Sequence, residues 1–266
     1  MFRWKASKRN ADPQKINPPT NLIPFLPPQL FKDRGKKTLV VDLDETLVRS
    51  TFKRPSRILT AATLRLLHIP NRDAQWFLCR ASLLLQVTVD EKARNVYISQ
   101  RPGLYYTCIF RPFLAILGLA LFLDEVSKWF ELVIFTASVG MYADLVVDKI
   151  DPKNRFTWRL YREYCTYLNG TYVKDLSLLG RDLCNVIIVD NSTQAYLWHA
   201  ENAIPITSCV SRHVHVYSSH PDLGKIIAWI DDPHDTELID IIPILSSLAM
   251  VKDIRPVIRD ALLNLG

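Results

Sequence analysis

Three short runs dominated by aliphatic residues stand out along the chain, at residues 38–41, 131–135 and 185–189. A continuous apolar run of this length is typical of a strand that is buried on both faces of a parallel sheet. Helical spacing of apolar residues marks the segments 142–150, 193–199, 238–248 and 254–265. Buried strands that alternate with helices predict an α/β fold with a mostly parallel sheet flanked by helices.

Between the first two runs, the pattern predicts two short helices and a β-hairpin. The helices fall at 58–67 and 76–85. The hairpin strands fall at 86–89 and 96–100. After the hairpin, a further helix is expected to end near Lys128.

Shorter features precede the third run. Residues 159–167 are predicted to be strand-like. Asn169-Gly170 is predicted to form a turn, because both residue types accept a left-handed backbone. A short helix is then expected before Gly180.

At 266 residues, the chain has room for one large domain or two small ones. Residues 1–35 contain six prolines among scattered charges. This composition predicts an extended basic leader that lies on the domain or in solvent. We therefore expect one folded domain over residues 36–266.

Charge and cysteine content narrow the class of protein. The formal net charge of +6 is too small to indicate direct nucleic-acid binding. It fits either an ordinary soluble surface or a basic rim that attracts an acidic or phosphorylated partner. The five cysteines are widely spaced and form no CxxC pair, which favours reduced thiols in an intracellular protein.

One apolar segment, residues 104–123, is long enough to span a membrane. Arg111 and Pro112 lie near its middle, and a central arginine costs about 2.5–3.5 kcal/mol in a bilayer. A span there would also place the two halves of the domain on opposite sides of the membrane. We therefore predict a buried helix or an irregular insert, and no transmembrane span.

Polar residues that could form one binding site follow each of the three predicted strands. They are Asp42 and Asp44 after the first strand, Thr136 after the second, and Asp190 and Asn191 after the third. Ligands bind beyond the carboxyl ends of parallel strands, so these side chains are expected to share one crevice. Carboxylates gathered there repel one another unless a cation is present, and Mg²⁺ is an ion that prefers such oxygen ligands.

Lys174 lies shortly before the third strand. A lysine beside Mg²⁺ neutralises a phosphoryl group so that an anionic nucleophile can approach it. Aspartate can be that nucleophile, because aspartyl-phosphates are established covalent intermediates. The residues therefore predict phosphoryl transfer.

Four motifs carry a resemblance to a known family: DLDET (42–46), FTAS (135–138), VKDLS (173–177) and VDNS (189–192). In this order they resemble the four motifs of the haloacid dehalogenase (HAD) superfamily. From residue 36 onward, the chain is similar to the TFIIF-associating and small C-terminal-domain phosphatases, including the Dullard-like nuclear envelope phosphatases. The resemblance implies a Rossmann-like, HAD-like sheet with a small β-hairpin insert and no large cap domain.

The resemblance also implies a role for each matching residue. Asp42 would attack phosphorus, and Asp44 would protonate the leaving oxygen and later activate water. Thr136, Lys174 and Arg162 would bind phosphate or substrate.

Mg²⁺ would be held, directly or through water, by Asp42, Asp44, Asp190 and Asn191, with Asp44 offering its backbone carbonyl. Structural alternatives stay open from the residues alone. They are a helix cap for Thr136 or Asp190, a surface lysine at position 174, and a surface salt bridge for Arg162.

Three stretches have no counterpart in the family pattern, near 55–80, 104–121 and 210–228. They are either lineage-specific loops or translated intron sequence. The first two fall where a lid over the site would grow, so they bear on substrate access. Without a large cap, the open site suits a phosphorylated protein segment.

The leading hypothesis is a Mg²⁺-dependent protein serine/threonine phosphatase that forms an aspartyl-phosphate. The substrate would be the C-terminal domain of RNA polymerase II or a lipin-like phosphoprotein. Location would be the nucleus, or the nuclear envelope and ER surface with a regulatory subunit for membrane recruitment. The alternative is a non-catalytic subunit of the mitochondrial inner membrane import translocase, with which the basic N-terminus is consistent.

Overall fold

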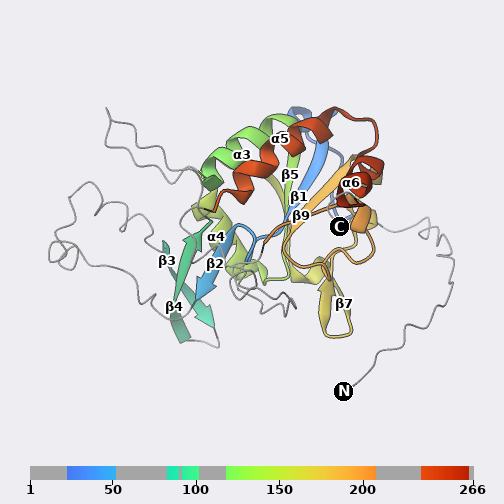
Figure 1. The fold of residues 1–266 in the computed structure, drawn as a ribbon. Coiled ribbons are helices and arrows are strands. Elements are labelled where there is room, and N and C mark those ends of the chain that lie inside the picture. Colours follow the sequence, from blue (N-terminus) through green and yellow to red (C-terminus); the bar gives the residue numbers. More distant parts are fainter. Residues whose placement is uncertain (1–22, 52–82, 90–91, 102–117, 208–234, 264–266) are drawn as a thin grey trace, which may run out of the picture.

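The computed structural model describes residues 23–51, 83–89, 92–101, 118–207 and 235–263 (Figure 1). At its centre is a five-stranded parallel sheet in the order β10-β9-β1-β5-β6. The strands are β1 (Lys37–Val41), β5 (Phe130–Phe135), β6 (Phe156–Leu160), β9 (Val186–Asp190) and β10 (Ala203–Pro205). The predicted α/β fold class is confirmed.

Smaller sheets and helices surround the central sheet. An antiparallel sheet contains β2 (Val48–Thr51), β4 (Lys92–Gln100) and β3 (Leu83–Val89), and a separate hairpin contains β7 (Thr166–Leu168) and β8 (Thr171–Val173). The described α-helices are α3 (Gly118–Trp129), α4 (Gly140–Ile150), α5 (Glu237–Met250) and α6 (Ile254–Leu263). The 3₁₀ turns are η1 (Phe31–Asp33), η2 (Arg162–Tyr164), η3 (Leu176–Leu179), η4 (Leu183–Asn185) and η5 (Ala200–Asn202).

Strand β1 lies between β5 and β9, where the order of the strands reverses. The chain runs from β1 outward through β5 to β6, and then returns to β9 on the other side of β1. Val41 pairs with Ile134 of β5 and with Val189 of β9. The carboxyl ends of the three strands therefore meet at a topological switch point, where sheets of this kind bind ligands.

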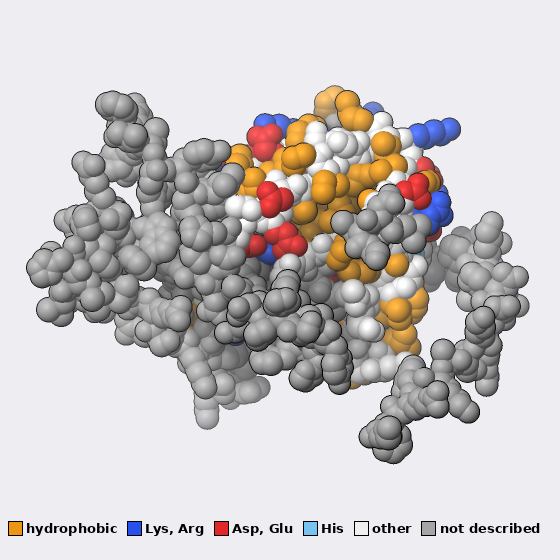
Figure 2. All heavy atoms as spheres, in the orientation of Figure 1, with side chains coloured by type: hydrophobic (Ala, Val, Ile, Leu, Met, Phe, Trp, Pro, Cys, Tyr) orange, Lys and Arg blue, Asp and Glu red, His pale blue; other side chains and the backbone are white. Residues whose placement is uncertain are grey.

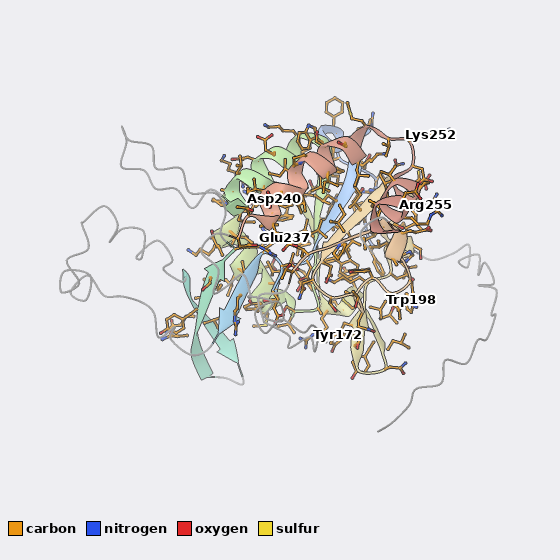
Figure 3. The ribbon with its side chains drawn as sticks, in the orientation of Figure 1. Tyr172, Trp198, Glu237, Asp240, Lys252 and Arg255 are labelled. Atoms are coloured by element: carbon orange, nitrogen blue, oxygen red, sulfur yellow. The ribbon has the colours of Figure 1, made fainter. Side chains whose placement is uncertain are left out.

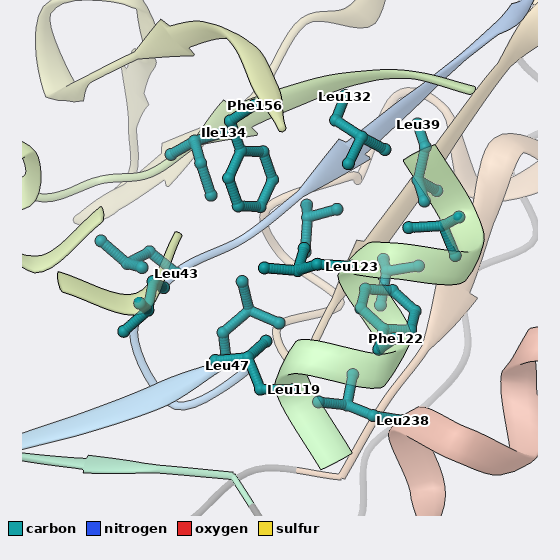
Figure 4. Close-up of a cluster of buried hydrophobic side chains, with 14 of the residues drawn as sticks. Leu39, Leu43, Leu47, Leu119, Phe122, Leu123, Leu132, Ile134, Phe156 and Leu238 are labelled. Carbon is teal, nitrogen blue, oxygen red and sulfur yellow. The ribbon is translucent and has the colours of Figure 1, made fainter. Parts of the chain in front are cut away.

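Residues of β1 alternate between two hydrophobic clusters, one on each face of the sheet. Leu39 and Val41 belong to the larger cluster, which includes buried residues of all four described α-helices. Helix α3 contributes Leu119 and Phe122, which lie three positions apart on its buried face (Figure 4). Full burial of each such side chain stabilises the fold by about 1.5–3 kcal/mol.

The second face of the sheet is covered by irregular segments. Its cluster contains Val40 of β1, Leu26 of the N-terminal segment, Leu176 of η3 and Tyr196 of a loop. The N–H of Phe25 donates to the carbonyl of Leu178 at 2.8 Å. The segment from residue 23 onward thus lies on the domain, while an extended leader over the whole of 1–35 stays a prediction.

The helix predicted at 193–199 is wrong, because residues 193–198 form successive turns. The N–H of His199 donates to the carbonyl of Tyr196, three positions earlier. In an α-helix it would donate to Ala195, but the carbonyl of Ala195 accepts the N–H of Lys174 at 2.7 Å. A tertiary hydrogen bond therefore replaces the local helical one.

The predicted hairpin is present and longer than expected, since β3 and β4 leave only residues 90–91 between them. Residues 83–85, which the sequence pattern assigns to a helix, belong to β3. Cross-strand pairing along β4 supplies the backbone hydrogen bonds that a helix would otherwise provide.

The strand-like prediction at 159–167 is wrong in its middle, where η2 turns the chain between β6 and β7. The turn predicted between β7 and β8 is confirmed. Asn169 and Gly170 have φ of 49° and 85°, the left-handed backbone that a tight hairpin needs.

Several predictions concern residues outside the described part. They are the helix at 58–67, the first part of the helix at 76–85, most of the insertions near 55–80, 104–121 and 210–228, and Cys79, Cys108 and Cys209. Within the described ranges, no helix combines the length and hydrophobicity needed to cross a bilayer. Cys165 and Cys184 are free thiols.

The described surface mixes charges of both signs. On the face seen in Figure 2, basic and acidic side chains lie near one another with apolar side chains between them.

Candidate active site

The ends of three neighbouring strands bring the predicted site residues together. Asp42 follows β1, and its N–H donates to the carbonyl of Val189 in β9 at 3.0 Å. Thr136 follows β5, and Asp190 is the last residue of β9. Asp42, Thr136 and Asp190 are all buried. The strand ends therefore place these three side chains at one edge of the sheet, as expected from the sequence.

Lys174 joins two of these strand ends. Its Nζ lies 2.6 Å from Oδ1 of Asp42 and 2.6 Å from Oδ2 of Asp190. Lys174 is only 2% exposed, so it is not a surface lysine. Burial alone favours the neutral amine, but the two carboxylates outweigh it and raise the pKa of Lys174 above its ordinary value. The ammonium therefore stays charged between them.

Asp190 is both a turn residue and a partner of Lys174. Its Oδ1 accepts the N–H of Ser192 at 2.8 Å, and its Oδ2 faces the lysine. Burial raises the pKa of Asp190 to about 6, with the charge of Asp42 adding to the rise and Lys174 opposing it. The helix-cap alternative does not account for the contact with Lys174.

Asp44 is held by two hydroxyl groups. The Oγ of Ser138 donates to Oδ2 of Asp44 at 2.7 Å, and the Oη of Tyr142 donates to Oδ1 at 2.8 Å. Burial raises the pKa of Asp44, and the nearby charge of Asp42 adds to the rise, while the two hydroxyls lower it in part. A carboxyl group whose pKa is raised holds a proton more readily than an ordinary carboxyl group, as a general acid must.

The loop after β1 is fixed by Asn191. The Oγ1 of Thr46 accepts the N–H of Asn191 and donates to its Oδ1, both at 3.2 Å. In the same loop, Glu45 has a φ of 68°, which is uncommon for a residue with a side chain and costs about 1–3 kcal/mol. Asn191 thus helps to hold the loop that carries Asp42 and Asp44 in a strained turn.

The hydroxyl of Thr136 has no hydrogen-bond acceptor within the part of the chain that the structure describes. Its Oγ1 accepts the N–H of Ser138 at 3.0 Å, so the hydroxyl proton is left to donate to a ligand. Helix α4 starts only at Gly140, and Val139 is its N-cap residue. The helix-cap alternative for Thr136 is therefore wrong.

Arg162 lies exposed at the rim of the site. Its Nε donates to the carbonyl of Ala137 at 2.6 Å, and its guanidinium carbon lies 5.2 Å from the ring centroid of Tyr172 on β8. Figure 3 labels Tyr172 near the β7–β8 hairpin. Among the described residues, no carboxylate forms the surface salt bridge that the sequence also allowed for Arg162.

The oxygens at the site fit Mg²⁺. Asp42 and Asp190 supply carboxylates, while Asp44 offers its backbone carbonyl, because its side chain already accepts two hydrogen bonds. Mg²⁺ often uses one or two carboxylates and keeps several waters. Accordingly, no three His, Cys, Asp or Glu side chains of the described ranges form a ready-made metal cage. The carboxylates of Asp42 and Asp190 beside the single ammonium of Lys174 also leave negative charge for a cation to balance.

Sequence reasoning missed Ser138 and Tyr142, whose hydroxyls hold Asp44. The FTAS motif indicated only Thr136 as a site residue. The sequence offered no signal for this pair, because Ser138 precedes the helix predicted at 142–150 and lies before the N-cap residue of α4 in the structure.

The sequence was compared with protein families and with known proteins. The model of the family described as "NLI interacting factor-like phosphatase" matches residues 37–213, which include every site residue above. The chain belongs to this family. The resemblance to the TFIIF-associating and small C-terminal-domain phosphatases is therefore confirmed at the level of the family.

Relatives in several organisms carry phosphatase names. The chain is 36% identical over 226 residues to "Phosphatase PSR1" of Saccharomyces cerevisiae, covering 85% of this chain and 39% of the relative. It is 34% identical over 235 residues to the human "Carboxy-terminal domain RNA polymerase II polypeptide A small phosphatase 1", covering 88% of this chain and 68% of the relative. The chain covers 39%, 35% and 59% of the length of three relatives, from Saccharomyces cerevisiae, Caenorhabditis elegans and Dictyostelium discoideum.

A solved structure shares the fold. The chain matches the RNA polymerase II CTD phosphatase Fcp1 with a TM-score of 0.51 and 21% identity, covering 80% of this chain and 62% of the other. This similarity supports the HAD-like fold. The family and the named relatives give no support to the alternative of a mitochondrial import subunit.

Proposed function

We propose that this domain is a Mg²⁺-dependent protein serine/threonine phosphatase that acts through an aspartyl-phosphate. The observation that carries the proposal is the contact of one buried ammonium, that of Lys174, with both Asp42 and Asp190 at the switch point of the sheet. A buried cation between strand-end carboxylates suits the binding and transfer of a phosphoryl group. Family membership supports the same reaction class.

In the first step, an oxygen of Asp42 attacks phosphorus, and the bond from phosphorus to the serine or threonine oxygen breaks. Asp44 gives its proton to that leaving oxygen. Lys174 offsets charge on the phosphoryl group, and the Thr136 hydroxyl donates a hydrogen bond to it. In the second step, water attacks the phosphorus of the aspartyl-phosphate while Asp44 accepts a proton, which frees phosphate and restores Asp42.

Mg²⁺, when bound, would neutralise further charge on the phosphoryl oxygens. Asp42, Asp190 and the backbone carbonyl of Asp44 would hold it, with Asn191 acting directly or through water. The side chain of Asn191 already holds Thr46, so a water between Asn191 and the ion fits its position best.

The substrate we propose is a phosphorylated protein segment. Relatives named for the C-terminal domain of RNA polymerase II make that repeat the first candidate, and a lipin-like phosphoprotein is the second. Arg162 at the exposed rim suits contact with such a segment. A nuclear or nuclear-envelope location, with a regulatory subunit for membrane recruitment, follows from these candidates.

The test is an assay of the purified chain on phosphoserine peptides of the RNA polymerase repeat, with Mg²⁺ and with EDTA. We expect turnover that requires the metal and is lost in Asp42→Asn. Asp253→Asn is the matched control, because among the described residues Asp253 forms an ion pair only with Arg255, at the partly exposed start of α6. Equal turnover in wild type and Asp42→Asn would overturn the proposal.

A further inference from the structure

The carboxylate of Asp44 is clamped on both oxygens by hydroxyl donors from one segment. Ser138 and Tyr142 both lie between the end of β5 and the first turn of α4. They reach Oδ2 and Oδ1 of Asp44 at 2.7 and 2.8 Å. Two donors on different oxygens fix the plane of a carboxylate, whereas one donor would leave it free to rotate.

A third hydroxyl extends this contact to the small antiparallel sheet. The Oγ of Ser50, on β2, is hydrogen-bonded to the Oη of Tyr142. Burial raises the pKa of Tyr142, and the charge of Asp44 adds to the rise, so the phenol keeps its proton. Because the Tyr142 hydroxyl donates its one proton to Asp44, it accepts the hydrogen bond from Ser50, and Ser50 thereby helps to fix the phenol.

We propose that Tyr142 and Ser138 are positioning residues for proton transfer by Asp44, and this inference rests on the proposed phosphatase function. Asp44 has to serve twice, giving a proton to the leaving oxygen and taking one from water. The two hydroxyl donors hold the orientation of the Asp44 carboxyl group through both transfers, while each of its oxygens keeps a second lone pair. Neither hydroxyl needs to touch phosphorus or the leaving group.

Loss of a clamp hydroxyl should slow phosphoryl transfer by an amount that depends on the leaving group. A serine alkoxide is a poor leaving group and needs a proton, whereas para-nitrophenolate leaves without one. With enzyme in excess and at saturation, the single-turnover rate of leaving-group release reports phosphoryl transfer to Asp42 and not substrate affinity. Tyr142→Phe should slow release from a phosphoserine peptide by about tenfold to a hundredfold, and release from para-nitrophenyl phosphate by less than about threefold.

Two further variants separate positioning from structure. Ser138→Ala should show the same selective loss, and Ser138→Thr should restore most of the rate because it keeps a hydroxyl. Tyr161→Phe is the matched control, since the Tyr161 hydroxyl donates at 2.6 Å to Asp144 on α4 and not to Asp44. It should leave both rates unchanged, and thermal unfolding of each variant should confirm that it is folded.

Each outcome decides a separate point. A loss confined to the phosphoserine peptide supports the inference. An equal loss on both substrates, or no loss, overturns it while leaving the phosphatase function standing. Absence of metal-dependent release by the wild-type protein on either substrate overturns the phosphatase function itself, and the inference falls with it.

Discussion

Lys174 and Asp42 lie 132 positions apart in the chain, yet Nζ of the lysine is 2.6 Å from Oδ1 of the aspartate. The lysine follows β8, and its N–H is fixed by the carbonyl of Ala195, which belongs to the loop after β9. The aspartate is fixed by β1 in the centre of the sheet. The contact therefore depends on three parts of the chain: β1, the end of β8 and the loop after β9.

Replacing Lys174 by Met should lower turnover by about 10²–10³-fold, because one charge that stabilises the transition state is lost. It should also lower the free energy of unfolding at pH 7 by about 3–5 kcal/mol, since Asp42 and Asp190 would be left buried without their cation. Peptide assays and urea unfolding measure the two effects. Lys128→Met, at an exposed lysine paired with Glu125, should change neither. Full activity of Lys174→Met would remove the lysine from the site.

Glu131 is a buried anion that joins several segments far from the active site. Arg181 donates to both of its oxygens at 2.8 Å, Trp158 donates at 2.8 Å and Thr38 at 2.9 Å. Glu131→Gln would leave Arg181 without its partner, so we expect a loss of about 3–5 kcal/mol in unfolding free energy at pH 7. Glu125→Gln, in an exposed pair, should cost less than about 1 kcal/mol in the same urea experiment.

The same residue predicts a pH dependence of stability. Burial by itself would raise the pKa of Glu131, but hydrogen bonds from Arg181, Trp158 and Gln29 outweigh it and hold the pKa below its ordinary 4.5. The unfolded chain therefore binds the proton more readily, so this stabilisation is fully present above about pH 4.5 and is lost as the pH falls through the lower, folded value. Between pH 5 and pH 3, wild type should lose more stability than Glu131→Gln. Parallel curves for the two proteins would contradict this account.

Arg101 is a fully buried cation next to the loop after β1, which carries Asp42 and Asp44. It pairs with Asp235 at 2.7 Å and with Glu237, and it donates to the carbonyl of Thr207 at 2.9 Å. Its N–H donates to the carbonyl of Leu47 at 2.9 Å. Arg101 thus ties the loop after β1 to the start of α5.

Arg101→Met should therefore lower the unfolding free energy by about 3–5 kcal/mol, because two carboxylates lose their partner. We also expect lower phosphatase activity in the folded fraction. Arg255→Met breaks a half-exposed pair with Asp253 and should cost less than about 1 kcal/mol. Similar losses in the two variants would show that Arg101 has no special structural role.

Two glycines with left-handed backbone should respond differently to the same change. Gly170 has φ +85° and open space where a Cβ would lie. Gly170→Ala should therefore lower the free energy of unfolding only by the cost of a left-handed backbone, about 1–2 kcal/mol. Gly180 has φ +72°, and a Cβ there would lie 2.5 Å from Cβ of Pro24. Gly180→Ala should lower the free energy of unfolding by more, because the new Cβ would clash with Pro24. Limited proteolysis of this variant should show faster cleavage near Pro24. Equal thermal shifts for the two variants would be the contrary result.

The local predictions succeeded where a segment's own pattern determines its structure. The apolar runs became β1, β5 and β9, and Asn169-Gly170 became the β7–β8 turn, because burial on both faces and positive φ each demand particular residue types. The helix at 193–199 failed because Lys174 takes a carbonyl that the helix needs. Such competition from a distant N–H leaves no trace in the local sequence.

The sequence by itself determined which polar residues end each buried strand. Two aspartates follow the first strand, a threonine follows the second, and an aspartate ends the third. Those positions depend on strand ends, and strand ends can be read from hydrophobicity. Only the tertiary structure decided that Lys174 bridges Asp42 and Asp190, and that Ser138 and Tyr142 hold Asp44. Side-chain hydrogen bonds form over about 3 Å, so they depend on how distant segments pack and not on spacing along the chain.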